Sequence, residues 1–539
     1  MISDAPLTPG GLETLDWIIL AAYLMAMVAL GVSFYKGQKT TRDFFLAGRS
    51  MNWFPVGISL IATLFSANSY MAIPSATQKY GLVLFVGPFV IFLCIPIVNR
   101  IFLPFYNRMQ LYSAYEYLEH RFDVRVRCLA SGLFIVWRIT WMAAALYSAS
   151  LALWAATGGN INLYWTIVSL GLFATFYTVL GGMKAVIWTD VIQFCVLFGG
   201  MIVAATWATS EVTGGIATLF QTMADAGKTS FVANIPEMEA ATGLWAKLMA
   251  YFCVQDQMTL IGVIVSHLIA YVTFFTVDQV TVQRYFTTRS VEAGRRAFWV
   301  SAIGSLAISI CLTMLGMALF AYYSSHPLPE QIAGVEFQSD WKYPYFIATV
   351  LPAGVAGLLV AALYAATMSS LDSGINSCST AFLVDFWQRL KHGQVRPVEE
   401  EAGPGDSQSH QLFLARALTL VLGAMVTVLA CFVGALGDII VIGNKLVNSF
   451  AGPMFSIFLL GMLTRRARSM GVCVGAVAGM AVMAWLVFWT ELNFLWPSAF
   501  GLVVSLSVGY GLSLFEREPK AEKLQWTLFE QRKLWREES

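Results

Sequence analysis

Long apolar runs recur along nearly the whole chain, and they limit what it can fold into more than any other feature of the sequence. A helix needs about 20 consecutive apolar residues to cross the hydrocarbon core of a bilayer, and about thirteen runs approach that length. They lie near residues 15–35, 52–76, 81–105, 127–156, 162–182, 187–208, 257–281, 294–323, 343–384, 411–433, 437–463, 470–491 and 494–515. The sequence therefore predicts an all-α polytopic membrane protein. Its composition, 58% hydrophobic and 12% charged residues, excludes an ordinary soluble protein.

Basic residues gather in alternate loops between the predicted crossings. They are Lys36, Lys39, Arg42, Arg49, Arg100, Arg108, Arg121, Arg125, Arg127, Lys184, Arg284, Arg289, Arg295, Arg296, Arg389, Lys391, Arg396, Arg465, Arg466 and Arg468. Loops rich in Lys and Arg stay on the cytoplasmic side of a membrane. The pattern therefore predicts an N terminus outside the cell and a C terminus inside.

The second predicted crossing looks interrupted near its centre. It contains the stretch Ile61–Ser69, in which serine and asparagine compete with the backbone for hydrogen bonds, and Pro74 follows. Unwound backbone survives in a membrane only where it lines a cavity or is buried in protein, and broken helices mark the binding sites of transporters. A helix that is merely kinked at Pro74 is the alternative.

A second polar feature lies inside the ninth apolar run, in the stretch Ala365–Ser373. Helical spacing places Ser369, Ser370 and Ser373 on one side, with Ala366 one turn earlier. Asp372 adds a carboxylate, which is costly at bilayer depth and usually faces a cavity or an ion path. These hard oxygen atoms suit Na+. The alternative is that the serines only allow close helix packing.

Several motifs, taken together in this order, resemble the sodium:solute symporter family, which includes sodium-coupled glucose, sialic acid, proline and monocarboxylate transporters. The motifs are Tyr115–Phe122, Gly181–Gln193, Asp278–Tyr285, Ala366–Ser379 and Ala451–Gly461. The resemblance covers nearly the whole chain. It implies a LeuT-like fold, in which two inverted repeats of five helices each surround a central site.

The resemblance divides the chain into one transmembrane transporter domain, residues 1–515, and a cytoplasmic tail, residues 516–539. Within the domain, 52–208 forms the first repeat and 257–463 the inverted second repeat, while 15–35 and 470–515 form peripheral helices. The second and seventh crossings run in opposite directions in the predicted topology, as inverted repeats require. In the tail, Leu524, Leu528 and Trp535 recur at near-helical spacing, which indicates either an amphipathic helix on the inner membrane face or a solvated tail.

Carried over residue by residue, the resemblance implies a main Na+ site formed by the carbonyls of Ala62, Phe65 and Ala366 and the hydroxyls of Ser369 and Ser370. A second Na+ site, known in members that resemble sialic acid transporters, corresponds to Asp190, Ser369, Asp372 and Ser373. Those members carry a hydroxyl residue where this chain has Asp372. A second carboxylate near Asp190 either strengthens cation binding or holds a proton.

The resemblance places the solute beside Ser66, Ser69, Trp141 and Asn444, with Leu64 and Pro88 at further matching positions. Sugar transporters carry an amide and an imidazole where this chain has Leu64 and Ser69, and sialic acid transporters carry an arginine in place of Trp141. Arg138 and Lys445 leave an anionic solute open, against the alternative that they snorkel or form ion pairs. We interpret His267, in mid-membrane, as a packing or hydrogen-bonding residue.

These observations predict a Na+-coupled secondary active symporter in the cell membrane, plasma or bacterial inner, that imports a small polar organic solute of the sugar, sialic-acid-like or monocarboxylate class. Its expected partners are the solute, Na+ and the lipid bilayer, without nucleic acid. The sequence does not predict an oligomeric state. One alternative is a membrane sensor, since some proteins join this domain to a signalling kinase. Another is an embedded enzyme that uses Asp190 and Asp372 as an acid and base pair. Because a nucleophile or metal constellation is lacking, we expect no enzyme.

Overall fold

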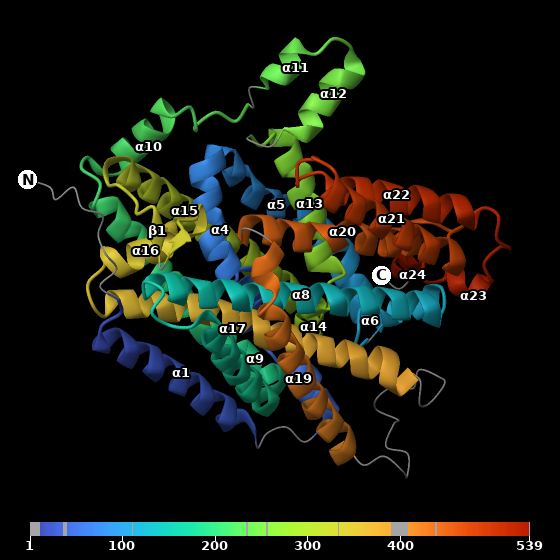
Figure 1. The fold of residues 1–539 in the computed structure, drawn as a ribbon. Coiled ribbons are helices and arrows are strands. Elements are labelled where there is room, and N and C mark those ends of the chain that lie inside the picture. Colours follow the sequence, from blue (N-terminus) through green and yellow to red (C-terminus); the bar gives the residue numbers. More distant parts are fainter. Residues whose placement is uncertain are drawn as a thin grey trace, which may run out of the picture.

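The structure is a computed structural model that describes residues 11–35, 40–109, 111–232, 235–254, 257–332, 334–389, 408–436 and 439–537. Within these ranges the side chains of residues 35, 41, 408–410, 436, 439–448 and 534–537 fall outside the description. Helices make up almost all of the regular structure (Figure 1). The prediction of an all-α protein is confirmed, apart from one short antiparallel strand pair.

The first half of the chain forms α1 (Thr14–Tyr35), α2 (Thr41–Leu46), η1 (Ala47–Arg49), α3 (Trp53–Leu64), α4 (Ala67–Tyr80), η2 (Gly81–Val90), α5 (Ile91–Ile97), η3 (Val98–Phe102), α6 (Leu103–Met109), α7 (Glu116–Arg121), α8 (Val124–Ala156), α9 (Leu163–Ser210), α10 (Gly215–Asp225), α11 (Pro236–Ala240) and α12 (Leu244–Cys253). The connection between the predicted runs 187–208 and 257–281 contains α10, α11 and α12.

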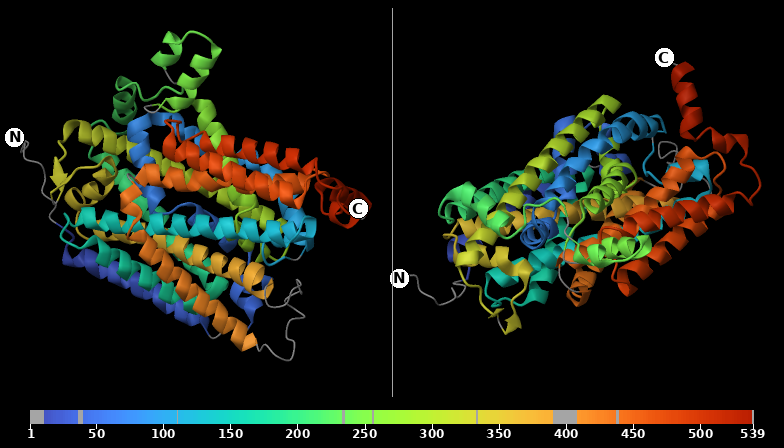
Figure 2. Two further views of the ribbon diagram at one scale, coloured as in Figure 1. Left: turned by 45° about the vertical axis from the view of Figure 1, so that its right-hand side comes forward. Right: turned by 90° about the horizontal axis from the view of Figure 1, so that it is seen from above.

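The second half forms α13 (Leu260–Thr276), α14 (Gln279–Phe286), α15 (Val291–Ser325), β1 (Gln331–Ile332), β2 (Val335–Glu336), η4 (Ser339–Trp341), α16 (Lys342–Thr349), α17 (Val355–Phe382), η5 (Leu383–Trp387), α19 (Gln408–Ala430), η6 (Val433–Leu436), α20 (Ile439–Leu463), α21 (Ser469–Trp489), α22 (Pro497–Ser513), α23 (Ala521–Leu524) and α24 (Leu528–Glu537). The long helices run along one common direction, with the start of α1 and the C-terminal helices at opposite ends (Figure 2).

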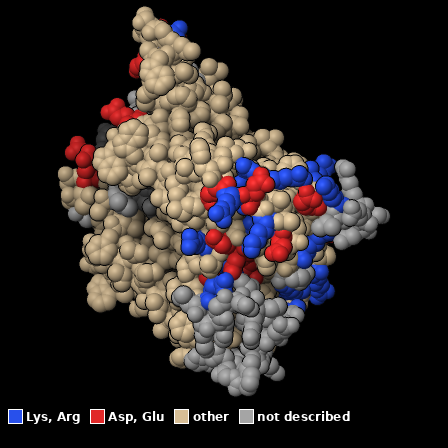
Figure 3. All heavy atoms as spheres, turned by 90° about the vertical axis from the view of Figure 1, so that its right-hand side faces the viewer, with Lys and Arg blue, Asp and Glu red and all other residues tan. Residues whose placement is uncertain are grey.

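Eight helices of the described part are long and apolar enough to cross a membrane, and the bent pair α13 and α14 makes a ninth. The prediction of a multi-pass membrane protein is thus confirmed. Charged side chains gather on the end of the molecule that carries the tail, where Arg465 pairs with Glu530 and Arg466 with Glu518 (Figure 3). An apolar bundle with charged ends is what a bilayer requires of a spanning protein.

Helix α3 ends at Leu64 and α4 begins at Ala67, so the predicted interruption is present. Phe65 and Ser66 between them have extended backbone, with φ of −106° and −113°. Pro74 lies inside α4 and does not cause the break. The alternative of a helix kinked only at Pro74 is therefore wrong. The last carbonyl groups of α3 are left without partners from their own helix.

A second broken helix lies at the junction of α13 and α14, which are bent by 44°. The sequence analysis treated 257–281 as one uninterrupted run, so this break was missed. Asp278 caps α14, because its carboxylate accepts a hydrogen bond from Val280 N at 2.9 Å. Aspartate is a preferred helix N-cap, and an aspartate inside an apolar run was the available signal.

Helix α9 contains both predicted runs 162–182 and 187–208, and it bends at Gly182, whose φ of 56° and ψ of −175° are not helical. Its two parts pack closely on different neighbours. A Cβ at Gly200 would lie 2.8 Å from Ala362 Cβ on α17, so only glycine permits this approach. Gly31 on α1 similarly faces Tyr177.

Helix α17 lies at the centre of the bundle, between α8 and α9, and almost every one of its side chains is buried (Figure 1). The carboxylate of Asp16 on α1 accepts hydrogen bonds from Gly354 N and Gly357 N, both at 2.7 Å, and so satisfies the first turn of α17. Helix α1, expected at the periphery, is thereby fixed to the central helix.

The tail forms α23 and α24, as its helical spacing suggests. Leu528 is buried against the protein rather than presented to lipid or solvent, and Lys523 donates a hydrogen bond to Glu119 O at 2.9 Å. The Trp526 ring stacks on His120 with centroids 4.8 Å apart. Trp535 lies outside the described side chains. The tail therefore packs on the protein, which neither sequence alternative anticipated.

Candidate ion and solute sites

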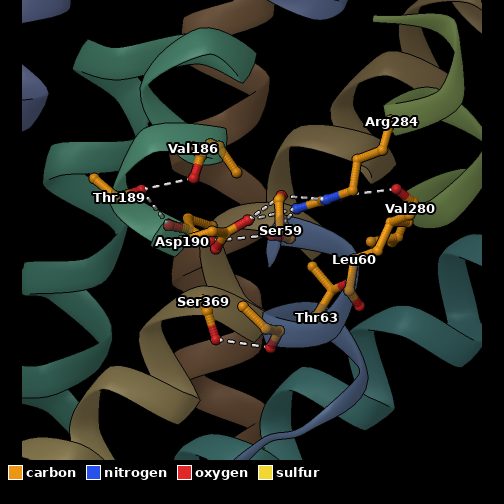
Figure 4. Close-up of polar contacts among 12 residues, drawn as sticks. Ser59, Leu60, Thr63, Val186, Thr189, Asp190, Val280, Arg284 and Ser369 are labelled. Atoms are coloured by element: carbon orange, nitrogen blue, oxygen red, sulfur yellow. Dashed lines mark hydrogen bonds and ion pairs between the residues drawn. The ribbon is translucent and has the colours of Figure 1, made fainter. Parts of the chain in front are cut away.

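Ser369 on α17 lies against the broken end of α3. Its hydroxyl oxygen is 3.0 Å from the carbonyl oxygen of Ala62 and 3.0 Å from that of Ala366. The hydroxyl of Ser370 lies 3.2 Å from Ala366 O. A hydroxyl has one proton, so it cannot fully satisfy two carbonyls. A group of partly satisfied oxygen atoms therefore converges from two helices at this point (Figure 4).

The expected main Na+ ligands fit this geometry. The structure brings together Ala62, Ala366, Ser369 and Ser370, all of them buried, and Phe65 stands at the break immediately after α3. The donor set is made of neutral, hard oxygen atoms, which suit Na+ better than a soft metal. The sequence run and the helix break, far apart in the chain, thus form one cluster.

Asp190 and Ser373, expected in a second Na+ site, contact a guanidinium group instead. Arg284 on α14 donates hydrogen bonds to Asp190 Oδ2 at 3.0 Å and to Ser373 Oγ at 2.5 Å. It also donates to Ser59 Oγ at 2.7 Å, and Ser59 donates to Asp190 Oδ2 at 2.5 Å (Figure 4). Asp190 Oδ1 has no hydrogen-bond partner among the described residues.

Arg284 was expected in a basic loop between two crossings, and that expectation is wrong, because it lies in helix α14. Its side chain is fully buried, as are Arg121 and Arg127 from another predicted loop. Arg127 pairs with Asp385 at 2.7 Å and with Glu119 at 2.9 Å. Buried charges need such partners. A loop position alone could not distinguish an arginine that reaches water from one that reaches a carboxylate distant in sequence.

Asp372 points to α9. Its Oδ2 accepts hydrogen bonds from Tyr177 at 2.8 Å and Thr189 at 3.4 Å, and its Oδ1 accepts one from Ser373 at 3.2 Å. Its nearest partners are therefore hydroxyl groups, while Asp190 has the guanidinium. The four residues of the expected second site lie in one buried region, with Arg284 among them.

Of the expected solute residues, Ser66 and Ser69 lie at the break between α3 and α4. Ser66 Oγ and Trp141 Nε1 are buried without hydrogen-bond partners among the described residues. Ser69 N bonds to Ser66 O at 2.9 Å in the first turn of α4. The side chains of Asn444 and Lys445 lie outside the description. Buried polar atoms without partners are rare, and they are typical of sites that receive a ligand.

Arg138 forms an ion pair inside the bundle, as one sequence alternative proposed. Its guanidinium pairs with Asp278 at the break between α13 and α14, with Nε 3.2 Å from Oδ1. The rings of Trp137 and Phe274 lie 5.1 and 5.2 Å from the guanidinium carbon. Arg138 is therefore already engaged and does not present a free charge to an anionic solute.

A cavity of about 260 Å³ lies between α4, η2, α13 and α15, beside the break at Phe65. Its wall includes Phe65, Pro88, His267, Tyr271, Ser309 and Phe494. Among the described residues, the lining contains no Asp, Glu, Lys or Arg. His267 Nδ1 lies 2.8 Å from Val263 O, so the hydrogen-bonding interpretation of His267 is confirmed, although the residue also lines the cavity.

A multi-pass membrane protein with two broken helices beside a buried oxygen cluster has the architecture of a secondary transporter. The sequence profile of the Sodium:solute symporter family matches residues 44–479. This chain therefore belongs to the sodium:solute symporter family, and Na+ is its coupling ion.

Individual relatives agree with this assignment. A sodium/sialic acid symporter of Aliivibrio fischeri is 32% identical over 92% of each chain. Human sodium-coupled monocarboxylate transporter 1 is 28% identical over 89% of this chain and 74% of its own length. A solved structure of a Na+-coupled sialic acid symporter, substrate-bound and outward-open, superposes with a TM-score of 0.80 at 30% identity, over 94% of this chain and 99% of that chain.

Proposed function

We propose that this symporter imports a small organic solute with one Na+ per cycle, and that the ion binds between the broken end of α3 and α17. The observation that carries the proposal is the convergence of Ser369 Oγ with Ala62 O and Ala366 O. The proposed ligands are the carbonyls of Ala62, Phe65 and Ala366 and the hydroxyls of Ser369 and Ser370. A cation there would join two helices that the hydrogen bond from Ser369 Oγ to Ala62 O already links.

The proposed topology has about thirteen crossings. They are α1, α3 with α4, η2 through α6, α8, the two parts of α9, α13 with α14, α15, α17, α19, α20, α21 and α22. The parts of α9 before and after Gly182 are about 28 and 42 Å long at 1.5 Å per residue, so each spans a bilayer. A broken helix then begins each repeat, in the regions 52–208 and 257–463, which supports a LeuT-like pair of inverted repeats.

The charged end of the molecule supports a cytoplasmic C-terminal tail and an N terminus outside (Figure 3). Arg289, Arg465 and Arg466 lie in connections of the kind that the positive-inside rule retains in the cytoplasm, and Arg295 lies near the start of α15. Lys36, Lys39, Lys391 and Arg396 are outside the described residues. With this orientation, Phe494, in the connection from α21 to α22, places the cavity on the outer side of the ion cluster.

The lining of the cavity favours a small solute with a substantial apolar part, as in the monocarboxylate class, over a sugar or a sialic acid. Aromatic and aliphatic groups such as Tyr271 and Phe65 dominate it, with hydroxyls such as Ser309 as polar contacts. Polyhydroxylated solutes need many hydrogen-bond partners, and buried polar groups left unpaired are costly. Ser66, Ser69, Trp141 and Asn444 remain the proposed solute contacts next to this cavity.

The second cation site implied by the resemblance would use Asp190, Ser369, Asp372 and Ser373. We propose that the Arg284 guanidinium serves as the positive charge of that region, because it already contacts Asp190 and Ser373. A second Na+ in the same place would meet a like charge in a water-poor environment. Import is then driven by the Na+ gradient and by about 2.3 kcal/mol per charge for each 100 mV of membrane potential.

The membrane sensor is the runner-up. The tail that would signal packs on the protein through Leu528 and Trp526. No specific observation favours the embedded enzyme, whose two carboxylates are engaged with Arg284 and Tyr177.

Solute uptake into proteoliposomes tests the proposal directly. Purified protein is assayed with monocarboxylates, sugars, sialic acids and amino acids, with an inward Na+ gradient or with K+ in its place. We expect Na+-dependent accumulation of a monocarboxylate-like solute, and none with K+. Accumulation of a sialic acid or a sugar instead would overturn the solute class. Na+ binding without flux for any compound would favour the sensor.

A further inference from the structure

The polar face of α17 continues beyond the proposed ion ligands toward the charged end of the molecule. Ser373, Asn376, Ser377 and Thr380 follow Ser369 and Ser370 at spacings of three and four residues, so they lie on one side of the helix. The side chains of all four are fully buried. We call these four residues the polar stripe. Apolar side chains would pack a bundle interior more stably, so the stripe calls for an explanation.

Gln283 on α14 lies against the polar stripe and joins three parts of the protein. Its amide nitrogen is 3.1 Å from Asn376 Oδ1, 3.0 Å from Thr380 Oγ1 and 2.7 Å from Phe45 O on α2. An amide nitrogen carries two hydrogens, so three acceptors compete for them. The side chain therefore closes the space between α14 and α17 without satisfying all its neighbours.

The unsatisfied atoms lie on the α14 side of α17. Gln283 Oε1, Asn376 Nδ2 and Ser377 Oγ have no hydrogen-bond partner in the described part of the protein. On the opposite side, Ser379 donates to Ile375 O at 2.8 Å and lies 3.2 Å from Thr419 on α19. A purely structural role would leave both sides equally well bonded, because orphaned buried polar groups are costly. The surplus polarity occurs only where α17 meets α14.

Helix α14 has the geometry of a hinged segment beside α17. It is the short half of a broken helix, bent by 44° from α13 at Val277 and Asp278. Hinges lie at a few residues that absorb backbone change between rigid elements. Its contacts with α17 are polar, through Gln283 and Arg284, and polar contacts of this kind can exchange for water when the helices separate.

We propose that the polar stripe is the route by which the co-transported Na+ leaves toward the cytoplasm, and that Gln283 is the latch that keeps this route closed. The proposal rests on the proposed function for the ion's identity and direction. When α14 swings away, it carries Arg284 with it and leaves the carboxylates of Asp190 and Asp372 beside the main ion ligands. Beyond them, Asn376, Ser377 and Thr380 line a passage of neutral oxygen and amide groups. Neutral groups solvate a cation without trapping it, which a path requires.

The test measures access to the stripe from the cytoplasmic side. Ser377→Cys, combined with Cys378→Ser, is exposed in inside-out membrane vesicles to a membrane-impermeant maleimide, in K+ without solute. Labelling is read by site-resolved mass spectrometry. Gln283→Leu, which keeps the size but removes the amide, is compared with Thr419→Val, which removes a buried polar contact on the other side of α17.

We expect Gln283→Leu to speed labelling about fivefold or more, the change in population that loss of a buried hydrogen bond causes, and Thr419→Val to leave it unchanged. The rate of isotopic Na+ exchange across proteoliposomes should also rise in Gln283→Leu. Thr380→Val, which is isosteric, is the second variant if Gln283→Leu does not fold, and should act in the same direction.

Unchanged labelling in both latch variants overturns the latch, whether or not the protein transports a solute. An equal increase in the labelling rate of Thr419→Val also overturns the latch, since such an increase would mean that the packing around α17 is loosened in general. Faster labelling without faster Na+ exchange refutes the ion route. Absence of Na+-coupled flux in the unmodified protein refutes the proposed function, and the labelling result still shows whether α14 and α17 separate.

Discussion

The hydroxyl oxygen of Ser369 lies 3.0 Å from the carbonyl oxygen of Ala62, across the contact between α17 and the broken end of α3. The two residues are far apart in the chain, and each belongs to a different repeat of the proposed fold. An ion bound at this contact, as proposed, would make ion binding and the relative position of the two repeats one event, which is what coupling requires. A ligand can shift a conformational equilibrium only by binding one state more tightly than the other.

Removing the charge of Arg284 should destabilise the protein strongly. Arg284→Gln leaves Asp190 buried without its cation, and such a loss costs about 3 to 5 kcal/mol. Thermal unfolding in detergent should show a clearly lowered midpoint. The double variant Arg284→Gln, Asp190→Asn should recover much of the lost thermal stability, because no unpaired charge remains. A single variant as stable as the unmodified protein would contradict the buried pair.

The charge moved per solute should equal one positive charge after the solute's own charge is subtracted. The reason is that Arg284 already contacts Asp190 and Ser373, which a second Na+ would need. Current and isotopic solute uptake, recorded on the same proteoliposomes, give this ratio. A value of two would show that a second cation enters and that Arg284 does not exclude it.

Alanine substitutions at two adjacent glycines of α9, Gly199 and Gly200, should have different effects on stability. A Cβ at Gly200 would lie 2.8 Å from Ala362 Cβ, whereas a Cβ at Gly199 would meet nothing within 4 Å. Gly200→Ala should cost about 1 to 3 kcal/mol by overpacking. Gly199→Ala should be neutral or stabilise by up to about 1 kcal/mol, since alanine favours helix. Equal unfolding midpoints for the two variants would argue against the close contact of α9 with α17.

Docking of the tail should weaken at acidic pH. Burial lowers the pKa of His120, which stacks on Trp526; the nearby Glu119 opposes this shift, and Arg127 and Lys523 add to it. The docked state therefore favours the neutral ring. Docking should be complete above the ordinary pKa of about 6.5 and should be lost progressively as the pH falls below it.

Hydrogen exchange of α23 and α24, corrected for intrinsic rates, measures this docking at pH 7.5 and 5.5. His120→Phe keeps an aromatic ring for stacking but does not titrate, so its tail should show the same protection at both pH values. Equal protection in the unmodified protein would mean that His120 does not control the tail.

The sequence predicted one helix break and missed the other for a physical reason. Serine and asparagine between Ile61 and Ser69 compete with the helix backbone, so the break at Phe65 was visible. The break before Gln279 depends on Asp278, which caps α14 through Val280 N and is held by an ion pair with the distant Arg138. From the sequence alone, an aspartate near the end of an apolar run is equally consistent with a helix N-cap and with the start of a loop.

The α17 part of the candidate ion cluster could be predicted because helical spacing places Ser369, Ser370 and Ser373 on one side of an apolar segment, with Ala366 one turn earlier. The role of Arg284 could not, since it depends on three other helices that meet it. Likewise, the tail's contact with His120 depends on where the last crossing ends. Local patterns thus indicated which residues are unusual, and only tertiary packing showed which of them meet.

Equilibrium Na+ binding to Ser369→Ala tests the central claim most directly, with Ser379→Ala as the matched control on the same helix. Ser379 bonds to Ile375 O and Thr419, away from the ion cluster. Isothermal titration of purified protein should show Na+ affinity reduced at least about tenfold in Ser369→Ala, equivalent to about 1.4 kcal/mol, and unchanged in Ser379→Ala. Unchanged Na+ affinity in Ser369→Ala, in a folded protein, would contradict an ion site between α3 and α17.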